Sequence, residues 1–340
     1  MLKRINQEIQ ERKNYLNNQK VNSIYFGGGT PSILNAADIK TLLKNIYKHY
    51  TINTNAEITL ECNPDDLSKF KLSLYKKIGI NRLSIGVQSF DNNDLKFMNR
   101  SHNVREAITS IKLAQKVGFE NITIDLIYGL PNQTLKKWGV NLDVMFNLNI
   151  KHFSAYSLEI EKKTALYHLV KNKKIEPLSE NQTIAHFNLL QQKAKENGFI
   201  HYEISNLGKK GFFSKHNTNY WTNNHYLGIG PSAHSYNGNS RRWNVSSNKK
   251  YISNTNYFQQ EVLSVTEKYN EYIFTSLRTI WGINTITIQK KYGDKIILHF
   301  LKEIKKWQEQ KHVIAVENIY TLTSKGKVFA DAIASDLFIV

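Results

Sequence analysis

The sequence predicts an α/β protein: a partial β/α barrel followed by a small, mainly helical C-terminal domain. Two observations predict the barrel. Short β-branched runs alternate with longer amphipathic segments through the first half of the chain, the pattern of strands and helices around a parallel sheet. Several of these runs are almost continuously apolar, as in strands covered on both faces. A third observation sets the rest apart, because the alternation stops near residue 200 and a helical pattern returns near residue 265.

The predicted elements follow one another in a regular order. Strands are expected at residues 23–26, 57–62, 82–88, 121–128 and 152–158. Helices are expected at residues 36–50, 67–77, 104–117, 135–148 and 183–198, because apolar residues recur there at spacings of three and four. In a β/α barrel, the functional groups lie at the C-terminal ends of the strands and in the loops that follow them. Polar residues at those ends are therefore the first candidates for a site.

The composition is that of a globular protein with an excess of positive charge. Lysine and arginine number 46 against 28 aspartate and glutamate residues, which gives a formal net charge of +18 in 340 residues. Such an excess would suit nucleic acid, an anionic membrane surface or an acidic small molecule. The lysines are scattered rather than clustered, so we interpret them as solvated surface and disfavour nucleic acid as a partner.

Cys62 is the single cysteine of the chain. It excludes an internal disulfide, and it excludes any metal or iron–sulfur site that takes several thiolates from these residues. No apolar run approaches the roughly 18 residues of a membrane span. The N-terminus has a charged helical pattern rather than that of a signal peptide. We therefore expect a cytoplasmic protein with no membrane span.

Glycine residues follow the first predicted strand. Gly27, Gly28 and Gly29 stand there in a row, and Thr30 adds a hydroxyl. Glycines let the backbone approach a ligand closely and present bare N–H groups to it. A tight turn from strand to helix needs glycine as well, so this motif alone leaves both interpretations open.

Four further polar residues stand at or after the next strands. Glu61 ends the strand at 57–62, where it could bind a ribose diol or an amine, or cap the next helix. Gln88 ends the strand at 82–88, and Arg100 lies in the segment that follows. Asp125 interrupts an apolar run, where a carboxylate needs an arginine or a ligand as its partner. Together these residues indicate a rim for a polar, zwitterionic ligand such as a nucleoside–amino-acid conjugate.

The motifs in their order resemble those of a known family. The blocks are YFGGGTPSIL, ITLECNPDDL, INRLSIGVQSF, NRSH, ITIDLIYGLPNQT, HYEISNLGKKG, HNTNYW and GIGPSAHSY. They are similar to those of radical S-adenosylmethionine proteins related to oxygen-independent coproporphyrinogen III oxidase, and most similar to the HemW branch of heme chaperones. The resemblance covers nearly the whole chain.

The resemblance implies roles for individual residues. It implies that Gly28 and Glu61 contact a first S-adenosylmethionine. In the coproporphyrinogen enzyme, a second S-adenosylmethionine is lined by positions that match Gly29, Thr30, Gln88, Arg100 and Asp125. In HemW-like proteins these five residues could shape the substrate or heme cavity instead.

The resemblance also implies residues for heme. HNTNYW resembles the HNxxYW signature of the HemW branch and contains His216, Asn217, Tyr220 and Trp221. An imidazole can ligate heme iron, and aromatic rings can pack on a porphyrin face. His234, in GIGPSAHSY, is a second candidate. A surface or hydrogen-bonding role, which is the more common one for a histidine in a loop, is the alternative for both.

The family carries CxxxCxxC near its N-terminus, where three thiolates hold a [4Fe–4S] cluster that cleaves S-adenosylmethionine. The present sequence contains no such motif. We therefore expect a radical S-adenosylmethionine type of partial barrel that lacks its first strand, and a chain that is an incomplete form of a longer protein. As written, it holds no metal and should not cleave S-adenosylmethionine, and whether it is an enzyme stays open.

Three domains and one function follow from these interpretations. Residues 1–200 would form the partial barrel, 201–262 a HemW-like extension, and 263–340 a helical domain of winged-helix type. The expected function is that of a heme chaperone, which binds heme and delivers it to an unidentified acceptor protein. An oxygen-independent coproporphyrinogen III oxidase of porphyrin biosynthesis is the first alternative. A basic nucleic-acid-binding protein is the second.

Overall fold

The computed structural model describes all 340 residues and divides them into two compact units. Unit 1 consists of residues 1–24, 35–57 and 214–340, and unit 2 of residues 25–34 and 58–213. The division passes through strands β1 (Val21–Phe26) and β2 (Ile52–Cys62). No helix is both long and apolar enough to cross a bilayer.

Unit 2 is built on parallel strands. The end of β2 pairs with β3 (Arg82–Gln88), β3 with β4 (Asn121–Tyr128) and β4 with β5 (His152–Ser157), all in parallel. Two short strands, β6 (Ile200–Glu203) and β7 (Asn206–Gly208), continue the sheet antiparallel after β5. The full order of the seven-stranded sheet is β1-β2-β3-β4-β5-β7-β6.

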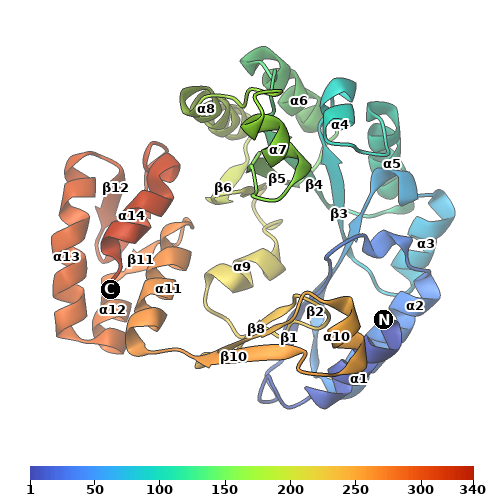
Figure 1. Cartoon of the computed structure of the whole chain (residues 1–340), viewed down its shortest axis with the longest axis horizontal. Helices are drawn as coiled ribbons and strands as arrows, with labels where there is room; N and C mark the ends of the chain where they lie inside the picture. The colour runs from blue at the N-terminus through green and yellow to red at the C-terminus, as the bar shows by residue number, and fades with distance from the viewer. The chain divides into compact units, whose positions relative to one another are not determined.

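Helices connect the strands of unit 2, and Figure 1 shows α3, α5, α6 and α8 along one side of β3 to β5. The helices are α3 (Lys69–Lys77), α4 (Asn92–Phe97), α5 (Val104–Val117), α6 (Leu135–Asn147), α7 (Ala165–Lys171) and α8 (Glu180–Glu196). Local sequence starts several of them. In α5, the Asn103 side chain accepts from the backbone of Glu106, whose carboxylate accepts from the backbone of Asn103. The predicted partial β/α barrel is thereby confirmed.

The two faces of the sheet in unit 2 differ in chemistry. Leu60, Leu83, Ile85, Ile124 and Phe153 are completely buried on the side that packs against the helices. The other side, here called the polar face, carries the alternating residues Glu61, Ser84, Thr123, Asp125, His152 and Ser154, which are matched across neighbouring strands. Both faces of these strands are largely buried, as expected from their nearly continuous apolar runs, but one of the two faces is polar. The barrel side is polar, as a ligand site requires.

Most predicted elements lie where they were expected. β3 and β4 have the predicted limits, and α5 matches 104–117. β2 differs, because it begins at Ile52 rather than at residue 57. Its first residues include Thr54 and Asn55, which are exposed and give no hydrophobic alternation from which a strand could be predicted.

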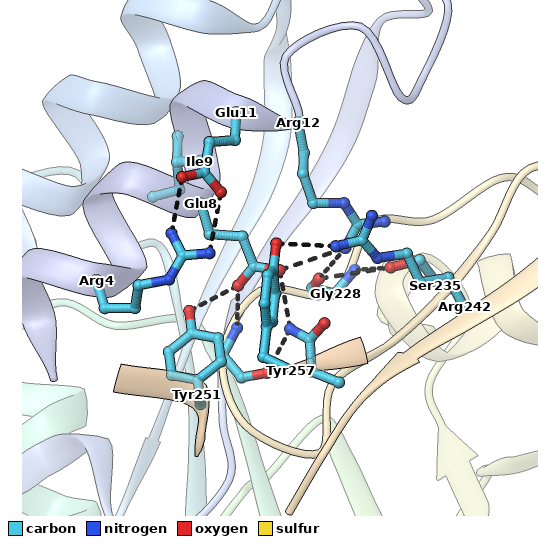
Figure 2. A network of polar contacts seen from close by, with 12 residues as sticks. Arg4, Glu8, Ile9, Glu11, Arg12, Gly228, Ser235, Arg242, Tyr251 and Tyr257 are labelled. Atoms are coloured by element: carbon cyan, nitrogen blue, oxygen red, sulfur yellow. Dashed lines mark hydrogen bonds and ion pairs between the residues drawn. The ribbon is translucent and has the colours of Figure 1, made fainter. Parts of the chain in front are cut away.

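Unit 1 contains the N-terminal helices and a small antiparallel sheet. The helices are α1 (Leu2–Glu11), α2 (Ala36–His49), α9 (Lys215–Trp221) and α10 (Asn248–Ser253). The sheet has the order β10-β9-β8 and is formed by β8 (His234–Tyr236), β9 (Ser240–Asn244) and β10 (Phe258–Val262). Figure 2 shows how α1 is tied to this region through the buried carboxylate of Glu8, which accepts from the Gly230 N–H at 3.0 Å and from Asn244 Nδ2 at 2.8 Å.

The C-terminal part of unit 1 has its own core. It consists of α11 (Val265–Leu277), β11 (Ile283–Asn284), α12 (Thr285–Tyr292), α13 (Asp294–Glu309), β12 (Val313–Val316), β13 (Ile319–Leu322) and α14 (Ala330–Leu337). Tyr269, Ile273, Phe300, Ile304 and Ile333 are among its buried residues. The three strands form an antiparallel sheet of order β11-β13-β12. The region is mainly helical as predicted, and the winged-helix interpretation stays a prediction.

Candidate functional site

One carboxylate joins the glycine turn after β1 to the end of β2. Glu61 Oε2 accepts the backbone N–H of Gly28 at 3.0 Å, and Glu61 Oε1 accepts the hydroxyl of Tyr25 at 2.8 Å. A Cβ atom on Gly27 would lie 2.8 Å from Glu61 Oε1 and 2.5 Å from the Tyr25 ring, so only glycine permits this approach. Gly28 and Gly29 have φ angles of +78° and +73°, with nothing within 4 Å of an added Cβ. Glu61 therefore shapes a turn whose backbone stays exposed.

Gln88 and Arg100 lie together over Gly86 of β3. An added Cβ on Gly86 would meet Gln88 Nε2 at 2.9 Å and Arg100 Nη2 at 3.5 Å. Arg100 Nη2 donates to Asn63 Oδ1 at 2.9 Å. Gln88 has a φ of +66° where the register between β3 and β4 shifts, and strained backbone of this kind is often found at functional sites. Thr30 is half-buried before the short 3₁₀ helix Pro31–Ile33 and does not cap it with its side chain.

Asp125 lies half-buried in β4 on the polar face. Ser84 Oγ donates to Asp125 Oδ2 at 3.2 Å, and Ser154 of β5 is its register partner. Burial raises the pKa of Asp125 to about 6, and the nearby charge of Glu61 acts in the same direction. The hydrogen bonds of Ser154 and Ser84 and the charge of Arg82 oppose the rise. A carboxyl that titrates near neutral pH can exchange a proton with a bound ligand.

Residues of β6 and β7 extend the polar face beyond β5. Ser154 Oγ donates to Asn206 Oδ1 at 2.9 Å, and Asn206 Nδ2 donates to the carboxylate of Glu203. The backbone N–H of Ser205 donates to Glu203 Oε2 at 3.1 Å. Glu203 and Asn206 were not among the predicted site residues. They belong to the HYEISNLG block, whose polar residues were the available signal.

A fully buried polar cluster closes the polar face near the beginning of the strands. His152 Nδ1 lies 2.6 Å from Thr123 Oγ1 and 3.3 Å from Arg82 Nη2, and its Nε2 lies 2.8 Å from the hydroxyl of Tyr202. Burial, together with the charge of Arg82, lowers the pKa of His152 well below its usual value. Burial therefore favours the neutral form of this imidazole. The residues of this cluster were not among the predicted site residues either. The alternation of Arg82 and Ser84 with Leu83 and Ile85 was the available signal.

The heme candidates of HNTNYW form helix α9 in unit 1. The rings of His216 and Tyr220, one turn apart, meet edge to face at 4.9 Å, and Tyr220 contacts Tyr226 at 4.5 Å. Tyr220 is 41% exposed, and His216, Asn217 and Trp221 are half-buried. The helix therefore offers an imidazole and aromatic rings on a partly open surface.

His234 has a different neighbour. It is exposed at the start of β8, and its ring stacks on Trp243 of β9 with centroids 6.2 Å apart and planes inclined by 19°. Trp243 was not a predicted site residue. Each of the two histidine rings thus contacts an aromatic ring, His216 that of Tyr220 and His234 that of Trp243.

Comparisons with known proteins identify the family. Residues 3–143 match the family described as the Radical SAM superfamily. The heme chaperone HemW of Bacillus subtilis is 33% identical over 344 residues, which cover 96% of this chain and 91% of that protein. The heme chaperone HemW of Buchnera aphidicola subsp. Schizaphis graminum is 32% identical, with 96% and 86% covered. The chain belongs to the HemW family of radical S-adenosylmethionine proteins.

A solved structure agrees with this assignment at the level of the fold. Coproporphyrinogen III oxidase (HemN) from Escherichia coli, described as a radical SAM enzyme, aligns with a TM-score of 0.84 at 22% identity. The alignment covers 99% of this chain and 82% of that one. The predicted family and fold are confirmed. At this identity the likeness shows the fold alone.

Membership of the HemW family implies S-adenosylmethionine and a [4Fe–4S] cluster. The residues of this chain do not fit the cluster. Cys62 is buried, and burial raises the pKa of its thiol far above the usual range, which disfavours the thiolate that binds iron. No group of three or more His, Cys, Asp or Glu side chains is placed to hold a metal ion.

Proposed function

We propose that this HemW-family chain binds heme and delivers it to an acceptor protein. The observation that carries the proposal is the likeness to heme chaperones along 96% of the chain, which includes the helix that presents His216. The geometry of α9 supports it, because an imidazole beside the ring of Tyr220 can ligate iron while aromatic rings cover the porphyrin.

A hemin titration followed at the Soret band tests heme binding. The wild-type protein should give a saturable shift of the Soret band. His216→Ala should weaken hemin binding about tenfold, as expected when an iron ligand, or a residue that orients one, is lost. His168→Ala is a matched control, because His168 also meets a tyrosine ring edge to face, Tyr167 at 5.7 Å, and is exposed. His168→Ala should bind hemin as the wild type does.

The outcomes separate the alternatives. Equal titrations for the wild type and His216→Ala would remove His216 from the site and direct attention to His234. The absence of any Soret shift would overturn heme binding. Conversion of coproporphyrinogen III would favour the oxidase, and salt-sensitive nucleic-acid binding without heme binding would favour the second alternative.

We further propose that the polar face of unit 2 binds S-adenosylmethionine. Three carboxyl groups, Glu61, Asp125 and Glu203, lie along it or extend it. They suit a ligand that carries a sulfonium and an ammonium group, because opposite charge in a partly buried site favours binding. Gly28 and Glu61 are the predicted contacts of this ligand. Gly29, Thr30, Gln88, Arg100 and Asp125 are the predicted lining of a second S-adenosylmethionine or of a substrate or heme cavity.

Equilibrium dialysis with labelled S-adenosylmethionine tests this second proposal. The wild-type chain should retain the ligand, and Glu61→Gln should retain at least tenfold less, because a single charge-assisted hydrogen bond contributes about 1.5 to 3 kcal/mol. Asp66→Asn is the control, since Asp66 is engaged by Ser32 Oγ at 2.6 Å outside the predicted contacts. Equal retention by the wild type and Glu61→Gln would contradict the assignment of Glu61.

A further inference from the structure

Helix α9 begins on a buried carboxylate of β2. Glu57 is 5% exposed. Its Oε1 accepts the hydroxyl of Ser214 at 3.3 Å and the backbone N–H of His216 at 3.1 Å, and its Oε2 accepts the backbone N–H of Lys215 at 3.1 Å. The first N–H groups of a helix have no partner within the helix, so Glu57 satisfies two of them with a charged acceptor.

Ser214 fixes the direction of these hydrogen bonds. Its Oγ accepts the backbone N–H of Asn217 at 3.2 Å, as an N-cap does, while its hydroxyl proton goes to Glu57. The ammonium group of Lys215 donates to the carbonyl of Asn55 at 2.6 Å, which ties the helix to β2 a second time. The first turn of α9 is therefore fixed by hydrogen bonds to Glu57, to Ser214 and to the carbonyl of Asn55.

His216 is the residue on which these contacts converge. Its backbone N–H is bound by Glu57, and its ring is set edge to face against Tyr220 at an angle of 88°. An imidazole whose main chain and ring are both constrained presents its nitrogen in one direction, which strengthens a bond to a metal. Glu57→Gln would keep one acceptor oxygen and replace the other with an amide NH2 group, whose protons would face the N–H donors of α9.

We propose that Glu57 is a positioning residue for His216, holding α9 in the orientation in which the imidazole meets heme iron. This inference rests on the proposed heme function. Glu57 does not touch heme itself, and it acts through the backbone of α9.

The test is a double-mutant cycle on hemin affinity with Glu57→Gln, His216→Ala and the double variant. Glu57→Gln should weaken hemin binding about tenfold, as is typical for the partners of a metal ligand. It should also change the Soret maximum and the ferric low-spin signal of the bound hemin in the same way as His216→Ala does. In the His216→Ala background, Glu57→Gln should have little further effect, because the two changes remove one interaction.

Asp94→Asn is the matched control. Asp94 is also 5% exposed and also accepts two side-chain donors, Ser89 Oγ at 2.8 Å and Gln133 Nε2 at 3.1 Å, and it belongs to α4 of unit 2. It should cost stability without changing the Soret maximum. If Glu57→Gln fails to fold, Ser214→Ala removes one of the donors to Glu57 and should give a smaller loss with the same spectral change.

Two results of the hemin titrations would overturn the inference. They are additive losses in the double variant and equal spectra for Glu57→Gln and the wild type. Hydrogen exchange separates this failure from that of the proposed function. Glu57→Gln should speed hydrogen exchange of the α9 amides whether or not heme binds. If the wild-type protein does not bind hemin, the heme function alone is overturned. Unchanged exchange in α9 would overturn the anchor.

Discussion

Carboxylates in two regions of the molecule have opposite surroundings. In unit 1, Glu8 is completely buried and its two oxygens accept from the Gly230 N–H at 3.0 Å, the Tyr251 hydroxyl at 2.6 Å and Asn244 Nδ2 at 2.8 Å (Figure 2). Arg12 Nη1 lies 3.5 Å from the same carboxylate. On the polar face of unit 2, Asp125 is half-buried, and the Ser84 hydroxyl donates to its carboxylate at 3.2 Å. The difference separates a structural anchor from a candidate ligand site.

The physical reason lies in the cost of burying a charge. A buried carboxylate is stable when donors replace the water that it has lost, and Glu8 has donors on both oxygens. Asp125 has too few, so burial raises its pKa to about 6. Its remaining hydrogen-bonding capacity is what a ligand would use.

The largest expected effect comes from removing the charge of Glu8, the buried carboxylate that has donors on both oxygens. Glu8→Gln leaves Arg12 buried without its counter-charge, and removing one partner of a buried ion pair costs about 3 to 5 kcal/mol. Urea denaturation should show a loss of this size in the free energy of unfolding. Asp143→Asn is the control, because Asp143 pairs with Lys193 at 2.5 Å while the two side chains are 54% and 24% exposed, and it should cost under about 1 kcal/mol. A small loss for Glu8→Gln would show that the two regions do not differ as proposed.

The next effect is a pH dependence of Asp125. The folded protein holds this proton up to about pH 6, whereas the unfolded chain releases it near 3.8, the ordinary pKa of an aspartate. The free energy of unfolding of the wild type should therefore fall, relative to Asp125→Asn, as pH rises from about 4 to 6, and should then level off. At 1.36 kcal/mol for each pKa unit the difference is about 2 to 3 kcal/mol. Denaturation curves between pH 4 and 7 measure it, and a flat difference would contradict the raised pKa.

The smallest effect concerns the glycine turn. Gly27→Ala places a methyl group 2.8 Å from Glu61 Oε1 and 2.5 Å from the Tyr25 ring, so the carboxylate must move and stability should fall by about 1 to 3 kcal/mol. S-adenosylmethionine retention should fall with it. Gly79→Ala is the control, with a φ of +103° and nothing within 4 Å of the added Cβ. It should cost about 1 kcal/mol through the backbone alone and leave ligand retention unchanged. Equal retention by both variants would show that Glu61 does not need Gly27.

Much of unit 2 could be predicted from the sequence because its signals are local. The strands β3 and β4 and the helix α5 were predicted to the residue, since periodicity and capping act over a few neighbouring positions. The candidate rim also followed from sequence, because residues at the ends of parallel strands meet at one edge. The polarity of the second face was not predicted, since the nearly continuous apolar runs of several strands indicated only that both faces are covered.

The contacts that join distant segments could not be predicted. Glu8 binds groups at residues 230, 244 and 251, and Glu57 binds the start of α9 more than 150 residues later. A single sequence does not show which distant residue a carboxylate will contact in the fold. Asn206 likewise contacts Ser154 through the antiparallel pairing of β5 and β7, which no local pattern specifies, and Glu203 binds Asn206.

By itself the sequence determined the strand and helix order of unit 2, the HemW family and the residues offered for S-adenosylmethionine and heme. Tertiary structure alone decided which carboxylates are anchors and which keep capacity for a ligand. The reason is that secondary structure depends on neighbours along the chain, whereas the state of a buried charge depends on donors brought to it from anywhere in the fold. Glu8, Glu57, Glu61 and Asp125 differ little as residues. They differ in the number of donors that the fold supplies.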